Sequence, residues 1–188
     1  MNDATDCNDA IDVKIIFDME KMLSNFNTRT KHNDIALLEL EDNVDKYFSF
    51  SLFPACLHHE STPINDLTVS SWSRQIGSMH LETTDSSFQN RTNWLQKFSM
   101  QEVALEKCIE TFKEHPVTIV ESQMCATSPT NVNITCQILS GSPLQYKLND
   151  SYHVAGLSSF GAACLANFPD IYTRVSSYID WIESIVWP

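Results

Sequence analysis

Short apolar runs recur between polar turns from Leu67 onward, and this cadence constrains the fold more than any other feature of the sequence. Each run is the length of a strand, too short for a helix of ordinary length. Repeated short strands separated by turns are typical of β-barrels and β-sandwiches. The runs are Leu67 to Ser70, Asn93 to Gln96, Thr118 to Val120, Leu144 to Tyr146, His153 to Phe160 and Ile171 to Val175.

The first part of the chain carries two further predicted strands. Ile11 to Phe17 and Ile35 to Leu40 are largely apolar and rich in branched residues, with the polar turn Asn25 to Asn33 between them. Asn43 to Thr62 is predicted to be a connector, because it contains a proline, a cysteine and a polar tail. A short helix is predicted within Gln101 to Phe112.

The C-terminal segment has helical rather than strand spacing. Ser176 or Ser177 is a candidate N-cap, because a serine hydroxyl accepts a hydrogen bond from the first free amides of a helix. Apolar side chains then follow at the spacing of one helix face, which predicts an amphipathic helix laid on a β-body. They are Tyr178, Ile179, Ile182, Ile185 and Val186.

Composition narrows the class of protein. A chain of 188 residues with 43% apolar side chains supports one domain, or a truncated one, with a real core. Its formal charge of −12 repels phosphate backbones and anionic lipids. We therefore expect neither nucleic acid nor a membrane surface as a partner. Acidity of this kind also keeps a secreted protein soluble.

The six cysteines indicate disulfides. None lies in a Cys-x-x-Cys pair, which disfavours a zinc site or a thioredoxin-like motif. An even number spread through predicted loops favours an oxidising compartment, as do glycosylation sequons at Asn90, Asn133 and Asn149. The segment Met1 to Ala10 is polar and acidic, so we expect no signal peptide there. A chain that lacks its true beginning would reconcile disulfides with a missing export signal.

Several motifs, in this order and spacing, resemble the chymotrypsin-like (trypsin-family) serine proteases. The resemblance covers nearly the whole chain and is closest to insect clip-domain proteases and their non-catalytic homologues. The motifs are Asn33-Asp34-Ile35-Ala36-Leu37-Leu38, Trp72, Leu95-Gln96-Lys97, Met124-Cys125-Ala126, Cys136 to Leu144, Ser159-Phe160-Gly161, Cys164, and Pro169 to Val175 followed by Trp181. The family's opening strands and its Ala-Ala-His-Cys segment have no counterpart here.

The resemblance implies an all-β, trypsin-like double β-barrel whose first barrel is incomplete, with an amphipathic C-terminal helix. Residues 1–50 would be the remainder of the first barrel and 51–66 the connector. Residues 67–175 would form the second barrel and 176–188 the helix.

Disulfides Cys108–Cys125 and Cys136–Cys164 are implied in the same way. Cys56 lies where the family often tethers the protease domain to a light chain or pro-domain. Cys7 then pairs either with a cysteine in a missing segment or with Cys56.

The catalytic constellation of the family is only partly present. Ser140 matches the nucleophile and Asp34 the aspartate that orients the base, but no histidine matches the base. His32 lies close to Asp34 in the same strand entry, with nothing to direct it at Ser140. The remaining histidines are expected at the surface or in the core, and adjacent His58 and His59 would point apart on an extended chain. We expect no metal and no cofactor.

Two substitutions beside Ser140 depart from the family's Gly-Asp-Ser-Gly-Gly-Pro motif. Leu139 replaces the aspartate that pairs with the N-terminus released by activation cleavage, and leucine cannot accept that ion pair. Ile138 replaces the glycine whose amide donates to the oxyanion, and a β-branched residue resists the backbone conformations that glycine allows. Loss of one such donor costs roughly 10²–10³ in turnover.

The primary specificity pocket would be lined by Ile134, Ser159, Phe160, Gly161 and Asp170. Ile134 takes the position of the aspartate that selects basic side chains in trypsins, so a preference for Arg or Lys is not supported. Asp170 either restores negative charge at the pocket floor or is a solvated or capped turn residue.

These features favour a secreted pseudoprotease that binds rather than cleaves. Ser140 and Asp34 would then be relics in the cleft floor. The family analogy suggests a regulator or cofactor of an extracellular immune or melanization cascade, whose partners are proteases, zymogens or inhibitors. An alternative is an active endopeptidase whose histidine lies in a missing N-terminal segment. A third is a degenerate product that does not fold stably, because an exposed barrel interface promotes aggregation.

Overall fold

The computed structural model describes residues 25–38, 54–59, 64–72, 95–129, 138–161 and 168–188. Strands and helices follow one another in the order predicted for a β-body with a C-terminal helix. The strands are β1 (Cys56–Leu57), β2 (Leu67–Ser71), β3 (Gln96–Val103), β4 (Gln123–Thr127), β5 (Pro143–Leu148), β6 (Ser151–Phe160) and β7 (Asp170–Arg174). The helices are α2 (Leu105–Phe112), the 3₁₀ turn η3 (Val175–Tyr178) and α3 (Ile179–Val186).

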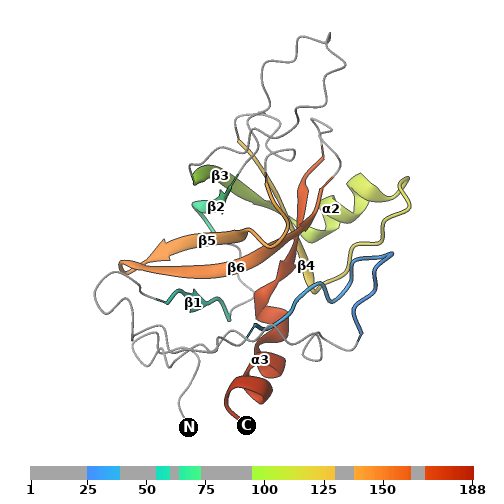
Figure 1. The fold of residues 1–188 in the computed structure, drawn as a ribbon. Helices are drawn as coiled ribbons and strands as arrows, with labels where there is room; N and C mark the ends of the chain where they lie inside the picture. Colours follow the sequence, from blue (N-terminus) through green and yellow to red (C-terminus); the bar gives the residue numbers. More distant parts are fainter. Residues whose placement is uncertain (1–24, 39–53, 60–63, 73–94, 130–137, 162–167) are drawn as a thin grey trace, which may run out of the picture.

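The sheet closes on itself. Its strand order is β1-β6-β5-β2-β3-β4-β7, and an additional pairing of β6 with β7 joins the two sides into a barrel. Every pair around the barrel is antiparallel, whereas β1 lies outside it and pairs parallel with β6, Cys56 opposite His153. In Figure 1, α2 lies at the side of this barrel and α3 below it. The all-β, trypsin-like fold class is confirmed.

The barrel interior is filled by side chains that alternate along the strands. On β2, for example, Leu67 and Val69 point inward because successive side chains of a strand face opposite sides. Gly156 on β6 lets two neighbours approach, since a Cβ there would stand 3.0 Å from both Met124 Sδ and Tyr172 Cβ. The buried cluster, at most 2% exposed, is Leu67, Val69, Met100, Met124, Ala126, Leu144, Ala155 and Tyr172.

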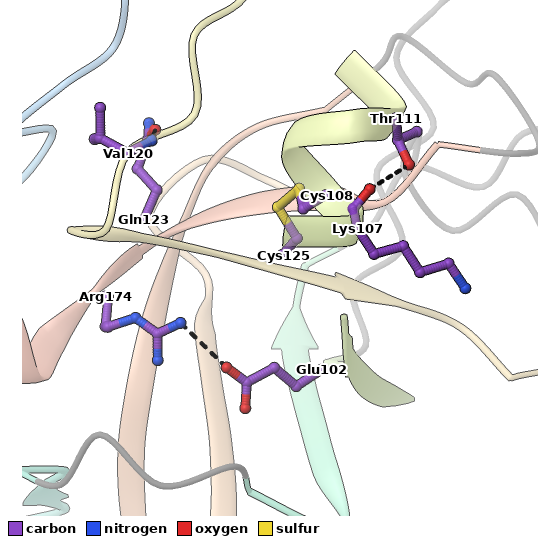
Figure 2. Close-up of a disulfide and its surroundings, with 8 residues drawn as sticks. All are labelled: Glu102, Lys107, Cys108, Thr111, Val120, Gln123, Cys125 and Arg174. Atoms are coloured by element: carbon purple, nitrogen blue, oxygen red, sulfur yellow. Dashed lines mark hydrogen bonds and ion pairs between the residues drawn. A yellow bond between two sulfur atoms is a disulfide. The ribbon is translucent and has the colours of Figure 1, made fainter. Parts of the chain in front are cut away.

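A second cluster joins α2 to the barrel wall. The Cys108–Cys125 disulfide connects α2 to β4 with its Cα atoms 6.3 Å apart (Figure 2). Phe112, Ile119 and Ile171 are buried around it. The bond closes a loop of 17 residues, worth about 3 kcal/mol in a loop-entropy estimate. This predicted pairing is therefore confirmed.

Of the other cysteines, only Cys56 lies within the described residues, and it is also disulfide-bonded. Cys7, Cys136 and Cys164 lie outside them. The predicted Cys136–Cys164 bond stays a prediction.

The C-terminal helix forms as predicted, but neither serine caps it. Ser176 and Ser177 are part of η3, and the N-cap position of α3 is Tyr178, which makes no side-chain capping bond. The 3₁₀ turn therefore takes up both candidate caps before the α-helix begins. Tyr178 and Ile182 pack with Ile35, so the helix holds the segment that carries Asp34.

Other boundaries differ from those predicted. Thr118 to Val120 forms no strand, because Ile119 is buried beneath α2 rather than paired in the sheet. Gln123 then opens β4, and its side chain accepts from the Val120 amide and donates to the Lys31 carbonyl. Within 35–38 only Ala36 forms an isolated bridge. Ile11 to Phe17 lies outside the described residues.

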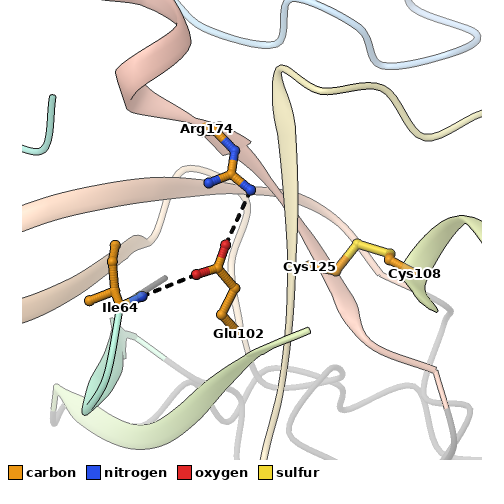
Figure 3. A network of polar contacts seen from close by, with 5 residues as sticks. All are labelled: Ile64, Glu102, Cys108, Cys125 and Arg174. Atoms are coloured by element: carbon orange, nitrogen blue, oxygen red, sulfur yellow. Dashed lines mark hydrogen bonds and ion pairs between the residues drawn. A yellow bond between two sulfur atoms is a disulfide. The ribbon is translucent and has the colours of Figure 1, made fainter. Parts of the chain in front are cut away.

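A partly buried ion pair ties the segment before β2 to the barrel. Arg174 at the end of β7 donates to Glu102 on β3 at 3.2 Å, and the two side chains are only 16% and 14% exposed. The other carboxylate oxygen of Glu102 accepts from the Ile64 amide at 3.3 Å (Figure 3). One carboxylate thus joins three segments. No helix in the described part of the chain is long and apolar enough to cross a membrane.

Candidate functional site

Ser140 lies on a tight turn that leads into β5. Gly141 adopts φ +82°, a left-handed conformation that glycine allows without strain. The Gly141 amide donates to the Ser158 carbonyl at 2.7 Å, and the Ser158 amide donates to Ser142 at 2.9 Å. The turn is therefore held against β6 by backbone hydrogen bonds on both sides of Gly141.

The Ser140 hydroxyl is exposed and directed at the backbone of β6. Its Oγ lies 3.4 Å from the carbonyl oxygens of both Ser158 and Ser159. Both acceptors are peptide carbonyls, which are too weakly basic to take the serine proton. Activation of a serine requires a base within hydrogen-bond reach.

Asp34 reaches the same strand from a distant part of the chain. The Ser159 hydroxyl donates to its Oδ2 at 2.5 Å. The Thr173 hydroxyl on β7 donates to its carbonyl at 2.8 Å. The preceding residue, Asn33, has φ 57° and accepts from the Tyr178 hydroxyl. Asp34 and Ser140 are thus brought together through Ser159, which the sequence indicated only as a pocket residue.

The described histidines make contacts elsewhere. His32 Nε2 lies 2.8 Å from the Thr118 carbonyl, so its ring is engaged with the loop after α2. His58 is buried, with Nδ1 2.9 Å from the Tyr146 hydroxyl. The His153 ring stacks on the Tyr146 ring, with the two centroids 5.1 Å apart. His59 and His115 are exposed, and His80 lies outside the described residues.

Ser71 holds the Ser140 turn from beneath. Its Oγ accepts from the Leu139 amide and from the Ser142 hydroxyl, each at 2.9 Å. Ser71 is 2% exposed, so these bonds form away from water. Sequence reasoning did not single out this residue, because a serine at the end of a strand carries no signal of a partner 68 residues away.

The predicted pocket residues lie along two adjacent strands. Ser159 and Phe160 end β6 and are half-buried, and Gly161 follows them, exposed. Asp170 is neither a solvated nor a capped turn residue, since it opens β7 and is 7% exposed. Burial, and after it the charge of Asp170, raises the pKa of Tyr172 two residues on. Ile134 lies outside the described residues, and Ile138 packs against the barrel core.

This closed antiparallel barrel, with Ser140 and Asp34 each contacting Ser159, is the arrangement of a chymotrypsin-like serine protease domain. The trypsin family model matches residues 5–182. This chain belongs to the trypsin family.

Three curated relatives are each 31% identical to it. Serine protease Hayan of Drosophila melanogaster aligns over 87% of this chain and 26% of its own length. Melanization protease 1 of Drosophila melanogaster aligns over 85% of this chain and 40% of its own length. CLIP domain-containing serine protease C9 of Anopheles gambiae aligns over 86% of this chain and 46% of its own length.

These relatives confirm the predicted resemblance to insect clip-domain proteases. The chain spans less than half the length of each of the three.

Proposed function

We propose that this chain is a non-catalytic, trypsin-like serine protease homologue that acts by binding proteins. The observation that carries this proposal is the environment of the Ser140 hydroxyl, whose partners in the described structure are two backbone carbonyls and no imidazole. A hydroxyl held in this way is not deprotonated at neutral pH. Without the base, a related triad system loses on the order of 10⁶ in turnover.

The residues beside Ser140 support the same proposal. Leu139 is uncharged, and its amide is held by the Ser71 hydroxyl. The turn therefore has no carboxylate that an activation-generated N-terminus could pair with. Asp34 retains an acceptor role toward Ser159, which gives it a structural use without a histidine.

The setting is proposed to be extracellular. The Cys108–Cys125 disulfide favours an oxidising compartment. The names of relatives, such as Melanization protease 1 and the Phenoloxidase-activating factor 1 of Holotrichia diomphalia, support a role in a protease cascade. Its partners would be proteases, zymogens or inhibitors of that cascade. Because Cys56 is disulfide-bonded, it would tether the domain to a pro-domain only if its disulfide partner belongs to that segment.

Labelling with a fluorophosphonate probe tests the central claim, because the probe modifies only activated serines. The secreted protein would be treated beside trypsin as the positive control and a Ser140→Ala variant as the matched negative control. We expect the wild-type chain to label no more than the Ser140→Ala variant. Label that depends on Ser140 would refute the proposal and favour an endopeptidase whose base comes from another segment.

A further inference from the structure

A groove lies between α2 and the turn that leads into β4, at the side of the barrel where Figure 1 places α2. It has a volume of about 650 Å³. Leu105, Glu106 and Ile109 of α2 form one wall, and residues 119–122 of the turn form the other. All of the lining falls within 95–129, which the structure describes without a break, and none of it belongs to the Ser140 turn.

Both walls of the groove are fixed to the barrel. The disulfide between α2 and β4 holds the helix (Figure 2). The turn is closed by a hydrogen bond from the Gln123 amide to the Val120 carbonyl at 2.9 Å. The Arg174 amide at the end of β7 donates to the Ser122 carbonyl, also at 2.9 Å. A ligand therefore meets a preformed surface, and binding does not have to order a loop.

The apolar part of the lining reaches solvent. Ile109 is 44% exposed, although Cys108 and Phe112 on the same helix are buried in the second cluster. Leu105 on α2 and Val120 on the turn are half-buried. Single exposed apolar side chains are ordinary, whereas several that line one concavity with polar residues at its edge mark an interaction site.

The charged part of the lining is negative. Glu106 and Glu121 are both exposed, one on each wall, and the lining contains no lysine, arginine or histidine. Neither carboxylate forms an ion pair with a described residue. A cation placed in the groove would therefore meet two carboxylates beside an apolar surface.

The described lysines near the groove are directed or paired elsewhere. Lys107 lies on the other side of α2 from Val120 in Figure 2. Lys113, at the C-terminal end of α2, is paired with Glu110. Lys31, on the loop behind the turn, lies over an aromatic ring. The negative charge of the groove is therefore left for a partner to neutralise.

We infer that this groove binds a segment of a partner protein in which an apolar side chain stands between lysine or arginine residues. The inference rests on the proposed function and names the chemistry of the partner. The apolar side chain would pack against Ile109 and Val120, and the basic side chains would pair with Glu106 and Glu121. A second copy of the chain is a poor occupant, since two molecules of formal charge −12 repel each other.

Fluorescence anisotropy of labelled peptides on the full chain tests this inference. The probe is Gly-Ser-Arg-Leu-Arg-Ser-Gly, and its counterpart Gly-Ser-Arg-Ser-Arg-Ser-Gly keeps the charge but lacks the apolar side chain. An ionic strength of about 0.15 M limits long-range attraction to the acidic chain, because the Debye length is then about 8 Å. We expect the leucine peptide to bind at least about tenfold more tightly than the serine peptide.

Variants in the groove and matched variants on α3 locate the binding site. Glu106→Lys, Glu121→Lys and Ile109→Ala should each weaken the leucine peptide about fivefold or more. Glu183→Lys changes the net charge by the same amount, and Ile185→Ala removes an apolar side chain of similar exposure. Neither control should change the affinity. Circular dichroism and the urea midpoint would confirm that every variant is folded.

Several outcomes would overturn the inference. The leucine peptide could fail to bind, or the two peptides could bind equally. Glu183→Lys could weaken binding as much as Glu106→Lys and Glu121→Lys do, which would show attraction to the net charge alone. A dimer in sedimentation that Ile109→Ala dissociates would assign the groove to a second copy.

These results are separable from the test of the proposed function. Fluorophosphonate label at Ser140 would refute the non-catalytic assignment and leave the peptide measurements intact, because the groove shares no lining residue with the Ser140 turn. Equal peptide affinities in a chain that does not label would refute only the groove.

Discussion

Ser159 donates its hydroxyl hydrogen bond to the Asp34 carboxylate, joining two residues 125 positions apart in the sequence. The carbonyl of the same Ser159 lies 3.4 Å from the Ser140 hydroxyl. The end of β6 therefore connects Asp34 and Ser140, the two residues that the family resemblance predicts at triad positions. This hydrogen bond holds the Asp34 carboxylate in place without a contact to any of the described histidines.

A double-mutant cycle measures this link. Asp34→Ala and Ser159→Ala should each lower the free energy of unfolding by about 2 kcal/mol, as expected for a hydrogen bond to a charged acceptor. The double variant should lose little more than either single variant, because both remove the same interaction. Urea unfolding gives the three values. Strictly additive losses would show that the two side chains do not interact in solution.

Ser71→Ala should loosen the Ser140 turn. It leaves the Leu139 amide and the Ser142 hydroxyl without their acceptor, at a cost of about 2 kcal/mol for buried groups. Amide hydrogen exchange should accelerate in the peptide containing residues 139–142. Ser99→Ala, on an exposed position of β3, is the matched control. Unchanged exchange in Ser71→Ala would mean that the backbone bonds to β6 suffice to hold the turn.

Glu102→Ala should strongly destabilise the barrel. The substitution leaves the mostly buried Arg174 guanidinium without its partner, and breaking such a pair costs about 3 kcal/mol. Glu102→Met with Arg174→Met should recover most of the loss, because no uncompensated charge remains. Lys147→Gln, in an exposed ion pair with Asp150, should leave the urea midpoint unchanged. A Glu102→Ala variant as stable as wild type would exclude a structural role for the pair.

Protonation of His153 at acidic pH should lower the free energy of unfolding. Burial, and then the charge of His59, lowers the pKa of His153 below its ordinary value of 6.5. The unfolded chain therefore binds this proton more readily than the folded chain does. The contribution of neutral His153 to the free energy of unfolding is fully present above pH 6.5. It decreases as the pH falls below 6.5, until His153 is protonated in the folded state as well.

His153→Gln should flatten this part of the pH profile. Urea unfolding at a series of pH values gives the slope, and His115→Gln on an exposed position is the control. A slope unchanged by His153→Gln would assign the acid sensitivity to other groups.

Much of the β-body could be predicted from the sequence because it depends on local alternation. The runs at Leu67, Leu144, His153 and Ile171 all became barrel strands, since each contributes inward side chains to the core. The predicted run Asn93 to Gln96 overlaps β3 only at the first residue of the strand, Gln96. Its exposed residues Lys97, Ser99 and Gln101 interrupt the apolar signal.

Other local predictions failed where tertiary packing competed with local preference. The apolar run around Ile119 is covered by α2 instead of pairing as a strand. Ser176 and Ser177 are residues that often cap helices, yet both form part of a 3₁₀ turn. This turn packs Tyr178 against Ile35. Such choices depend on neighbours that are distant in sequence.

The sequence by itself determined the order of the elements and the resemblance to the trypsin family, because motif order and alternation are local properties of the chain. That resemblance in turn implied the Cys108–Cys125 disulfide. Only the tertiary structure decided that Ser159 would contact both Asp34 and Ser140 and that Ser71 would hold the Ser140 turn. Each of these contacts joins segments that are distant in sequence and become neighbours only when the chain folds, and no local pattern encodes such a hydrogen bond.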